Sequence, residues 1–225
     1  MNFETFFMSC PEREATLADS LTSLEASGWL GPTEVVLDDG TGSTGLGRIH
    51  RTWRRMLRRA AKSTADLVLL CEDDVVFGRW FAENLLSWTL LDPLPGSGAM
   101  YASLYNPGRP FLIRRESERC LIVDPRFVWG AQALLLTPRT ARFVDAAWDD
   151  CDGNPDQRMP LIASRVTPIY YHLPSLVDHA PAASTWGGID HRAIDFDAEW
   201  RACNPGATDK KKRMTLPNHL AGHAR

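Results

Sequence analysis

Residues 66–77, DLVLLCEDDVVF, constrain the fold more than any other segment. Four apolar residues, 67–70, lead into three consecutive acids, Glu72, Asp73 and Asp74. Such a run, rich in Leu and Val, is typical of a strand buried on both faces in a parallel sheet. Carboxylates at the end of a buried strand are costly unless they are neutralised. A divalent cation that also holds substrate phosphates would neutralise them. The segment therefore indicates a metal-diphosphate site, and an acidic surface turn is the alternative.

The composition is that of an ordinary globular protein. The chain has 225 residues, enough for one α/β domain with a full core, and a net charge of −3, which gives no global reason to expect nucleic acid. Its five cysteines are far apart and form no C-x-x-C pair, which argues against a disulfide framework or a structural zinc site. The sequence also lacks a signal-peptide pattern and a long apolar run. We expect a cytoplasmic protein without a membrane span.

Alternating strand and helix patterns predict an α/β fold. A strand at 5–10, a helix at 13–27 that ends before Gly28 and a strand at 34–37 form a β-α-β unit, which implies a parallel sheet. Further patterns predict a helix over 79–91, strands within 98–106, 121–123, 129–137 and 167–171, and helices over 138–148 and from about 155. We expect a single domain with a mostly parallel central sheet flanked by helices.

A strongly basic helix is predicted over residues 48–62. At about 100° per residue, its cations fall within an arc of roughly 140°; they are Arg48, Arg51, Arg54, Arg55, Arg58, Arg59 and Lys62. No acid interrupts the sequence from Gly40 to Ala65. The arc is either a solvated surface or, since seven cations without counter-charges concentrate positive potential, a site for a phosphate-rich or acidic partner.

The order of these segments resembles glycosyltransferases of the GT-A fold. The motifs that carry the resemblance are SCPERE, TLADSLTSLEASGW, a strand ending in DDG, a strand ending in EDD, and WGAQALLLT before a helix. They are most similar to the lipopolysaccharide and procollagen galactosyltransferase group and to family 2-like transferases. The resemblance implies a GT-A-like catalytic domain over residues 1–190, with 191–225 as a peripheral extension. It also implies a metal-dependent hexosyltransferase that uses a nucleotide diphosphate sugar, with a UDP-sugar favoured.

The same resemblance implies roles for residues at the carboxyl ends of the strands. Asp74 would be the principal metal ligand, with Glu72 or Asp73 contacting the ribose or a metal-bound water, or Asp73 sharing the metal. The donor would also be contacted by Asp38 or Asp39, at its base or ribose, and by Arg13, at a phosphate. An Asx turn at Asp38 and a surface role for Arg13 are the alternatives.

A loop histidine completes the metal shell in many GT-A enzymes, and His179 in VDHAP takes that position. Imidazole suits Mn²⁺ better than Mg²⁺, so the resemblance favours manganese. His172 and Asp178 are the alternatives to His179, which could also be an ordinary polar surface residue.

Acceptor chemistry requires a general base if the reaction inverts the anomeric centre. Asp156 matches the family position, with Asp152 and Asp150 as competitors, and all three could instead cap a helix or belong to a solvated loop. Trp129 and Trp186 are candidate platforms for sugar stacking, although either could be a core aromatic.

The basic helix is the candidate platform for a large acceptor, through Arg51, Arg55 and Arg58. Such an acceptor could be a glycan, a lipid-linked sugar or a hydroxylated base in DNA. Two other functional classes remain open at this point. One is another metal-dependent nucleotidyl or phosphoryl transferase, and the other is a noncatalytic nucleic-acid-binding protein that uses the basic helix.

Overall fold

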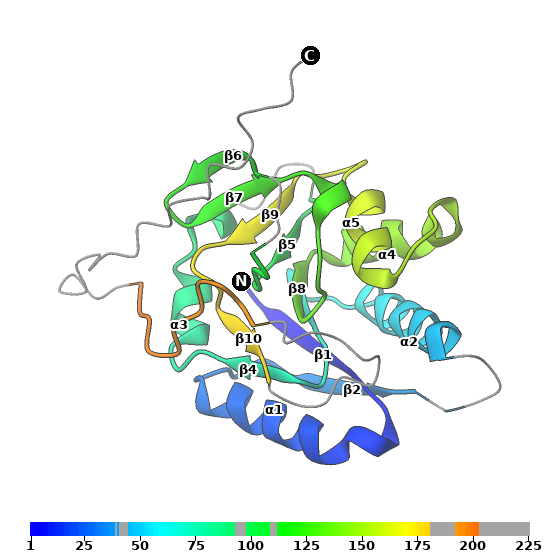
Figure 1. Ribbon diagram of the computed structural model, residues 1–225, viewed down its shortest axis with the longest axis horizontal. Coiled ribbons are helices and arrows are strands. Elements are labelled where there is room, and N and C mark those ends of the chain that lie inside the picture. Colours follow the sequence, from blue (N-terminus) through cyan, green and yellow to red (C-terminus); the bar gives the residue numbers. More distant parts are fainter. Residues whose placement is uncertain (39, 41–44, 93–97, 109–111, 181–191, 203–225) are drawn as a thin grey trace.

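The computed structural model describes residues 1–38, 40, 45–92, 98–108, 112–180 and 192–202 of the chain. Its main feature is a mixed sheet of eight strands in the order β2-β1-β3-β8-β5-β9-β7-β6 (Figure 1). The strands are β1 (Phe3–Ser9), β2 (Thr33–Leu37), β3 (Leu67–Cys71), β5 (Tyr101–Ser103), β6 (Leu112–Ser117), β7 (Cys120–Val123), β8 (Ala133–Leu136) and β9 (Ile169–His172). Strands β7 and β8 run opposite to the other six. The expected single α/β domain with a mostly parallel sheet is confirmed.

Helices cover both faces of this sheet (Figure 1). The α-helices of the described residues are α1 (Glu14–Ala26), α2 (Gly45–Ala60), α3 (Phe81–Leu86), α4 (Pro138–Ala146) and α5 (Pro155–Ala163), and the short 3-10 turns there are Pro11–Arg13, Thr89–Leu91, Pro125–Phe127 and Trp148–Asp150. Side chains of α2, α4 and α5 pack in one hydrophobic core, and those of α1 and α3 pack in another. The central sheet separates these two cores.

Strand β3 lies in the middle of this arrangement, and all of its residues are buried. Its side chains alternate between the two cores, with Val68 and Leu70 on the α2 side and Leu67 and Leu69 on the α1 side. Alternation of this kind follows from the two-residue period of a strand. A strand that contributes side chains to both cores has to be apolar at every position, as the sequence predicted for this strand.

The first half of the chain brings three strand ends together. Strand β1 pairs in parallel with β2 on one side and with β3 on the other, while α1 and α2 cross over opposite faces. Gly28 ends the predicted first helix in the left-handed conformation, with φ of 81°. The polar residues after β1, β2 and β3 consequently lie at one edge of the sheet, at the point where the connections change direction.

Several elements differ from the sequence predictions. Helix α2 begins at Gly45, earlier than predicted, and the 79–91 segment is the short α3 followed by a 3-10 turn. Strand β6 was not predicted; it is an edge strand and its arginines and glutamate are exposed. A second sheet also went unpredicted, in which β4 (Val75–Phe77) pairs antiparallel with β10 (Val177–His179). Both of its strands have only three residues, too few for a period to be recognised.

Residues 192–202 pack against the domain. Asn84 bonds to the main chain of this segment at Trp200 and Ala202, over 2.8 and 2.7 Å. Ser175 donates a hydrogen bond of 2.5 Å to Asp195. Within the described residues, no helix combines the length and the apolar character that a membrane span requires.

Candidate functional site

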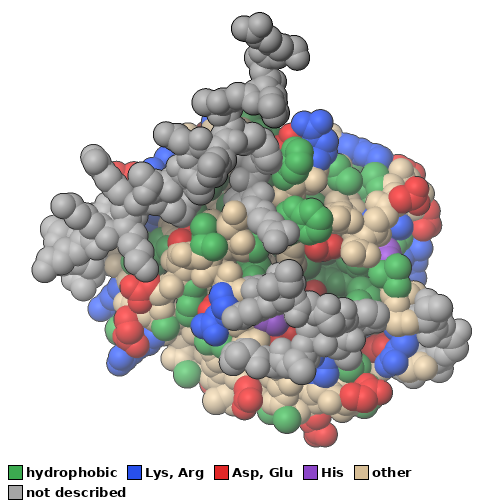
Figure 2. Space-filling model, in the orientation of Figure 1, with side chains coloured by type: hydrophobic (Ala, Val, Ile, Leu, Met, Phe, Trp, Pro, Cys, Tyr) green, Lys and Arg blue, Asp and Glu red, His purple; other side chains and the backbone are tan. Residues whose placement is uncertain are grey.

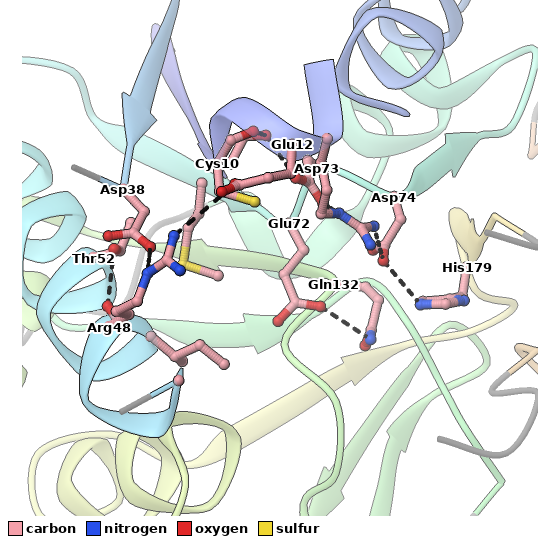
Figure 3. Close-up of a pocket in the computed structure, with 15 residues that line it drawn as sticks. Cys10, Glu12, Asp38, Arg48, Thr52, Glu72, Asp73, Asp74, Gln132 and His179 are labelled. Atoms are coloured by element: carbon pink, nitrogen blue, oxygen red, sulfur yellow. Dashed lines mark hydrogen bonds and ion pairs between the residues drawn. The ribbon is translucent and has the colours of Figure 1, made fainter. Parts of the chain in front are cut away.

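A cavity of about 510 Å³ opens at the carboxyl ends of β1, β2 and β3 (Figure 3). Each strand contributes polar side chains from the residues that follow it, and β10 and the start of β8 contribute one each. The main polar residues that line it are Ser9, Arg13, Asp38, Arg48, Glu72, Asp73, Asp74, Gln132 and His179. The structure thus gathers the predicted donor-site residues Arg13, Asp38, Glu72, Asp73, Asp74 and His179 in one place.

Arg13 bridges two of the three consecutive acids. Its Nε lies 2.7 Å from Asp73 Oδ1, and its Nη2 lies 2.6 Å from Asp74 Oδ2. Ser9 donates a hydrogen bond of 2.6 Å to the other oxygen of Asp73. Burial raises the pKa of Asp73, and the Ser9 and Arg13 contacts oppose that rise. Arg13 therefore supplies part of the neutralisation that the sequence assigned to a cation alone.

His179 reaches Asp74 because β10 pairs with β4, which places His179 opposite Val75. Its Nε2 lies 3.2 Å from Asp74 Oδ2. The hydrogen bond to Asp74 raises the pKa of His179, although burial opposes it. Burial would raise the pKa of Asp74, but the hydrogen bond and charge of His179, together with Arg13, outweigh it and hold that pKa below its ordinary value. The two side chains form one electrostatic unit.

Asp74 has an oxygen that the described residues leave without a partner. Its Oδ1 is buried and accepts no hydrogen bond from them, and a buried carboxylate oxygen without a partner is costly. No group of three His, Cys, Asp or Glu side chains in that part of the chain is arranged to hold a metal ion. Asp74 and the adjacent imidazole of His179 fit two positions of a cation whose other ligands are phosphate oxygens and waters.

Glu72 differs from its two neighbours because it pairs with neither Arg13 nor His179. Gln132 Nε2 donates a hydrogen bond of 3.2 Å to Glu72 Oε2. Burial raises the pKa of Glu72 well above its ordinary value, and the negative charges of Asp74, Asp156 and Asp73 add to that rise. Gln132 was missed in the sequence, where nothing near WGAQ indicates that β8 runs antiparallel beside β3.

Asp38 lines the same cavity and holds Arg48. Its Oδ2 lies 2.5 Å from Arg48 Nε, and its Oδ1 accepts a hydrogen bond of 3.1 Å from the Gly40 amide. The Asx turn considered from the sequence is thus present. Arg48, on the first turn of α2, brings a second guanidinium to the cavity, a role that the sequence did not single out. Asp39 lies outside the described residues.

A second cavity of about 510 Å³ adjoins the first. Ile49, Glu72 and Gln132 line both, so they form the wall between them. The remaining lining is mostly apolar and aromatic, namely Leu46, Trp53, Tyr105, Pro107, Trp129, Gly130, Ala131, Asn154, Pro155 and Asp156. Figure 2 shows hydrophobic and acidic side chains in the hollow near the centre of the face that it draws.

Asp156 and Trp129 both belong to this second cavity. The Gly130 amide donates a hydrogen bond of 3.3 Å to Asp156 Oδ2. Gly130 has φ of 80°, and a Cβ atom there would lie 2.4 Å from Gln132 Oε1, so only glycine fits. Asp152 lines neither cavity. Trp186, the other stacking candidate, lies outside the described residues.

The arginines of α2 have counter-charges from distant parts of the chain. Arg54 and Arg58 both pair with Asp145 on α4, and Arg59 pairs with Glu34 on β2. Arg55 donates a hydrogen bond of 3.1 Å to the Leu37 carbonyl. Several of the seven cations thus have partners on other elements, which the local sequence does not show.

His172 and Asp178, the two alternatives to His179, make contacts that stabilise the fold and lie outside the two cavities. His172 is fully buried against Trp88, and its Nδ1 lies 2.7 Å from the Pro174 carbonyl oxygen. Burial lowers the pKa of His172 to about 3. Asp178 accepts hydrogen bonds from Arg192 Nε and the Ala193 amide, over 2.6 and 2.7 Å. Neither residue lines the two cavities.

Comparisons with known proteins find similar structures but no similar sequences. No protein-family model and no curated protein matches the chain. The galactosyltransferase LgtC, solved with donor and acceptor sugar analogs, is 14% identical, with a TM-score of 0.47 over 85% of this chain and 91% of that one. The catalytic domain of Drosophila beta1,4-galactosyltransferase 7, in complex with xylobiose, is 10% identical, with a TM-score of 0.46 over 88% of this chain and 78% of that one.

A nucleotidyl-transfer enzyme is also among the similar structures. The enzyme 4-diphosphocytidyl-2C-methyl-D-erythritol synthase is 17% identical, with a TM-score of 0.43 over 75% of this chain and 88% of that one. All three structures are at most 17% identical to this chain, and their TM-scores are below 0.5. The function of this chain has to be argued from its own side chains.

Proposed function

We propose that this chain is a metal-dependent glycosyltransferase that moves a sugar from a nucleotide diphosphate sugar to an acceptor hydroxyl. The observation that carries the proposal is the buried Oδ1 of Asp74, which has no hydrogen-bond partner among the described residues and lies beside His179 in a cavity that adjoins a second one. Asp74 and His179 would hold the cation, with manganese favoured over magnesium because one ligand is an imidazole. When bound, the cation would neutralise the diphosphate and stabilise the departing nucleotide.

Cationic groups of the chain support a diphosphate in the first cavity. Arg13 and Arg48 both line it, together with Gly45 at the start of α2. Helix N-termini favour phosphate because their amide groups point outward and the helix dipole is positive there. Asp38 pairs with Arg48 and lines the cavity after β2, and it would contact the ribose or base of the donor. A UDP-sugar is the donor that we favour.

The second cavity suits the acceptor. Asp156 would accept the proton of the acceptor hydroxyl while the oxygen forms a bond to the anomeric carbon and the bond from that carbon to the diphosphate breaks. Trp129 has 39% of its surface exposed at this cavity and could stack on a sugar ring. No Lys or Arg is among the described residues that line it. We therefore favour an uncharged glycan-type acceptor over a hydroxylated base in DNA.

The lining of the second cavity, in which no described residue is Lys or Arg, also favours sugar transfer over nucleotidyl transfer to a phosphate group. A phosphorylated acceptor would need cationic partners, whereas the second cavity presents Glu72, Asp156 and apolar groups. Nucleotidyl or phosphoryl transfer remains the competing activity, and it predicts turnover of nucleoside triphosphates without any sugar donor.

Ligand-induced stabilisation tests the proposal directly. Thermal unfolding would be followed with UDP, GDP, CDP or ATP, each with and without Mn²⁺, and with the matching nucleotide sugars. We expect a diphosphate and Mn²⁺ together to raise the unfolding temperature, because a ligand that binds only the folded state stabilises it by mass action. The shift should disappear in Asp74→Asn and persist in Asp19→Asn, a change on the exposed face of α1.

Product formation then distinguishes the activities. Hydrolysis or transfer of sugar from a nucleotide sugar in the presence of Mn²⁺ supports the proposal. If no nucleotide gives a metal-dependent shift and no nucleotide sugar is turned over, the proposal is wrong. Turnover of ATP alone would favour the competing activity.

A further inference from the structure

Glu72 has a different environment from the two acids that follow it. Asp73 contacts Ser9 and Arg13, and Asp74 contacts Arg13 and His179. Among the described residues, Glu72 receives its side-chain hydrogen bond from Gln132. Figure 3 shows its carboxyl group extending away from Asp73 and Asp74 toward Gln132. Within the described residues, Glu72 thus forms no direct ion pair with Arg13 or His179, which hold the other two acids.

The position of Glu72 is set by two strands. It follows β3 directly, and its amide donates a hydrogen bond of 3.1 Å to the Gln132 carbonyl at the start of β8. Main-chain and side-chain contacts between the same two residues fix the carboxyl group in one orientation. Gln132 itself is only 7% exposed. Its amide group bonds to Oε2 of Glu72, and no described residue donates a hydrogen bond to the other carboxyl oxygen, Oε1.

In the proposed reaction, the transferred sugar would lie next to the residues that line both cavities. A donor with its diphosphate at Arg13 and Asp74 and an acceptor hydroxyl near Asp156 leave the sugar between them. Glu72 and Gln132 are the polar residues that line both cavities. A carboxyl group accepts hydrogen bonds from sugar hydroxyl groups, and it also donates one to them when it is protonated.

We infer that the Glu72 carboxyl group binds hydroxyls of the transferred sugar, and that Gln132 is the positioning residue that orients it. This assigns Glu72 to the sugar, where the sequence had suggested the ribose or a metal-bound water. The inference rests on the proposed function, because it assumes a nucleotide sugar in the first cavity. It predicts that the pair discriminates donors by their sugar hydroxyls, without contributing to nucleotide binding.

Calorimetric titration distinguishes binding of the sugar from binding of the nucleotide. Wild-type protein, Glu72→Gln and Gln132→Leu would each be titrated with UDP and with UDP-glucose and UDP-galactose at saturating Mn²⁺, or with GDP and GDP-mannose if GDP is the nucleotide that binds. We expect both variants to bind the free nucleotide as the wild type does. Their affinity for the preferred nucleotide sugar should fall by about tenfold, the effect of about one lost hydrogen bond.

A donor that lacks one hydroxyl provides the second readout. A deoxy-sugar donor that removes the contacted hydroxyl should weaken wild-type binding by about the same factor and weaken binding to Glu72→Gln less, because the amide has already weakened that hydrogen bond. Asp19→Asn serves as the matched control. Unfolding temperatures would be compared first, and Glu72→Gln keeps the size of the side chain if Gln132→Leu perturbs the fold.

The outcomes separate the inference from the proposed function. If the wild type binds no nucleoside diphosphate, the proposed function itself fails. If it binds nucleotide and nucleotide sugar but the variants lose affinity for both equally, or for neither, then Glu72 and Gln132 do not recognise the sugar and the inference is overturned. Loss confined to the nucleotide sugar supports it.

Discussion

Arg13 Nη2 donates a hydrogen bond of 2.6 Å to Asp74 Oδ2, although the two residues are 61 positions apart. A second bond from the same guanidinium reaches Asp73. The loop after β1 thus supplies a permanent counter-charge to the acids after β3. A cation at this site would bind beside an arginine, with Asp74 shared between them.

Removal of this guanidinium should destabilise the fold. Arg13→Ala leaves Asp73 and Asp74 buried with fewer partners, and breaking a buried ion pair costs about 3 kcal/mol in the free energy of unfolding. Urea denaturation near neutral pH measures the change. Arg79→Ala is the control, because its pair with Glu199 has side chains 62% and 68% exposed and such pairs contribute less than about 1 kcal/mol. Equal losses in the two variants would contradict the prediction.

His172 should make stability depend on pH in a specific direction. Burial lowers the pKa of His172 from 6.5 to about 3. Below 6.5 the unfolded chain takes up a proton that the folded chain does not, so the free energy of unfolding falls with pH by up to about 1.4 kcal/mol per unit. This contribution is fully present above the unfolded pKa.

His172→Gln removes this term and retains a polar side chain. The difference in the free energy of unfolding between wild type and variant should therefore narrow as the pH falls from about 7 to about 5. Urea denaturation at several pH values measures it. Parallel pH profiles for the two proteins would show that His172 does not carry the effect.

Local patterns were enough to predict the first half of the fold. Residues that end a strand follow the clear apolar segments of β1, β2 and β3. The parallel order of these strands follows from the short helical crossovers between them. Because the strands are parallel, the acids after β3 and Asp38 after β2 could be placed at the same edge of the sheet. These features depend on neighbours in the sequence, which is why they could be predicted.

The remaining parts of the site depend on contacts between distant segments. Strand β8 enters the sheet antiparallel between β3 and β5, and this puts Gln132 beside Glu72. His179 reaches Asp74 through a three-residue pairing with β4. The arginines of α2 find their acids on other elements. None of these contacts produces a hydrophobic period or a motif spacing that can be recognised in the sequence.

The α2 arginines should matter only for a polyanionic acceptor. Arg58 is 55% exposed and pairs with Asp145, so reversal of Arg51, Arg55 and Arg58 to Glu should change turnover of a neutral glycoside acceptor less than about twofold. Binding of DNA, measured by fluorescence anisotropy at several salt concentrations, should be weak and should weaken further in the triple variant. A large loss of turnover with the neutral acceptor would assign this face to acceptor binding.

Asp178 should link the 192–202 segment to His179, the proposed metal ligand. Its carboxylate is 3% exposed and accepts hydrogen bonds from the amide of His179, over 2.9 Å, and from Arg192 and Ala193. Asp178→Ala should lower the free energy of unfolding by about 2 kcal/mol. It should also weaken Mn²⁺ binding by about tenfold, because the carboxylate holds the main chain from which the His179 imidazole extends, and outer contacts of this kind support a metal ligand. Urea denaturation and calorimetric titration with Mn²⁺ measure the two effects.

Ser175→Ala provides the matched control for this prediction. Ser175 also ties the 192–202 segment to the domain, through its 2.5 Å bond to Asp195, but it does not line either cavity. Its removal should cost a similar free energy of unfolding and leave the affinity for Mn²⁺ unchanged. If both variants weaken Mn²⁺ binding equally, general loosening of the segment is the cause. A selective effect of Asp178→Ala would instead mean that the carboxylate holds His179 in the orientation that the cation requires.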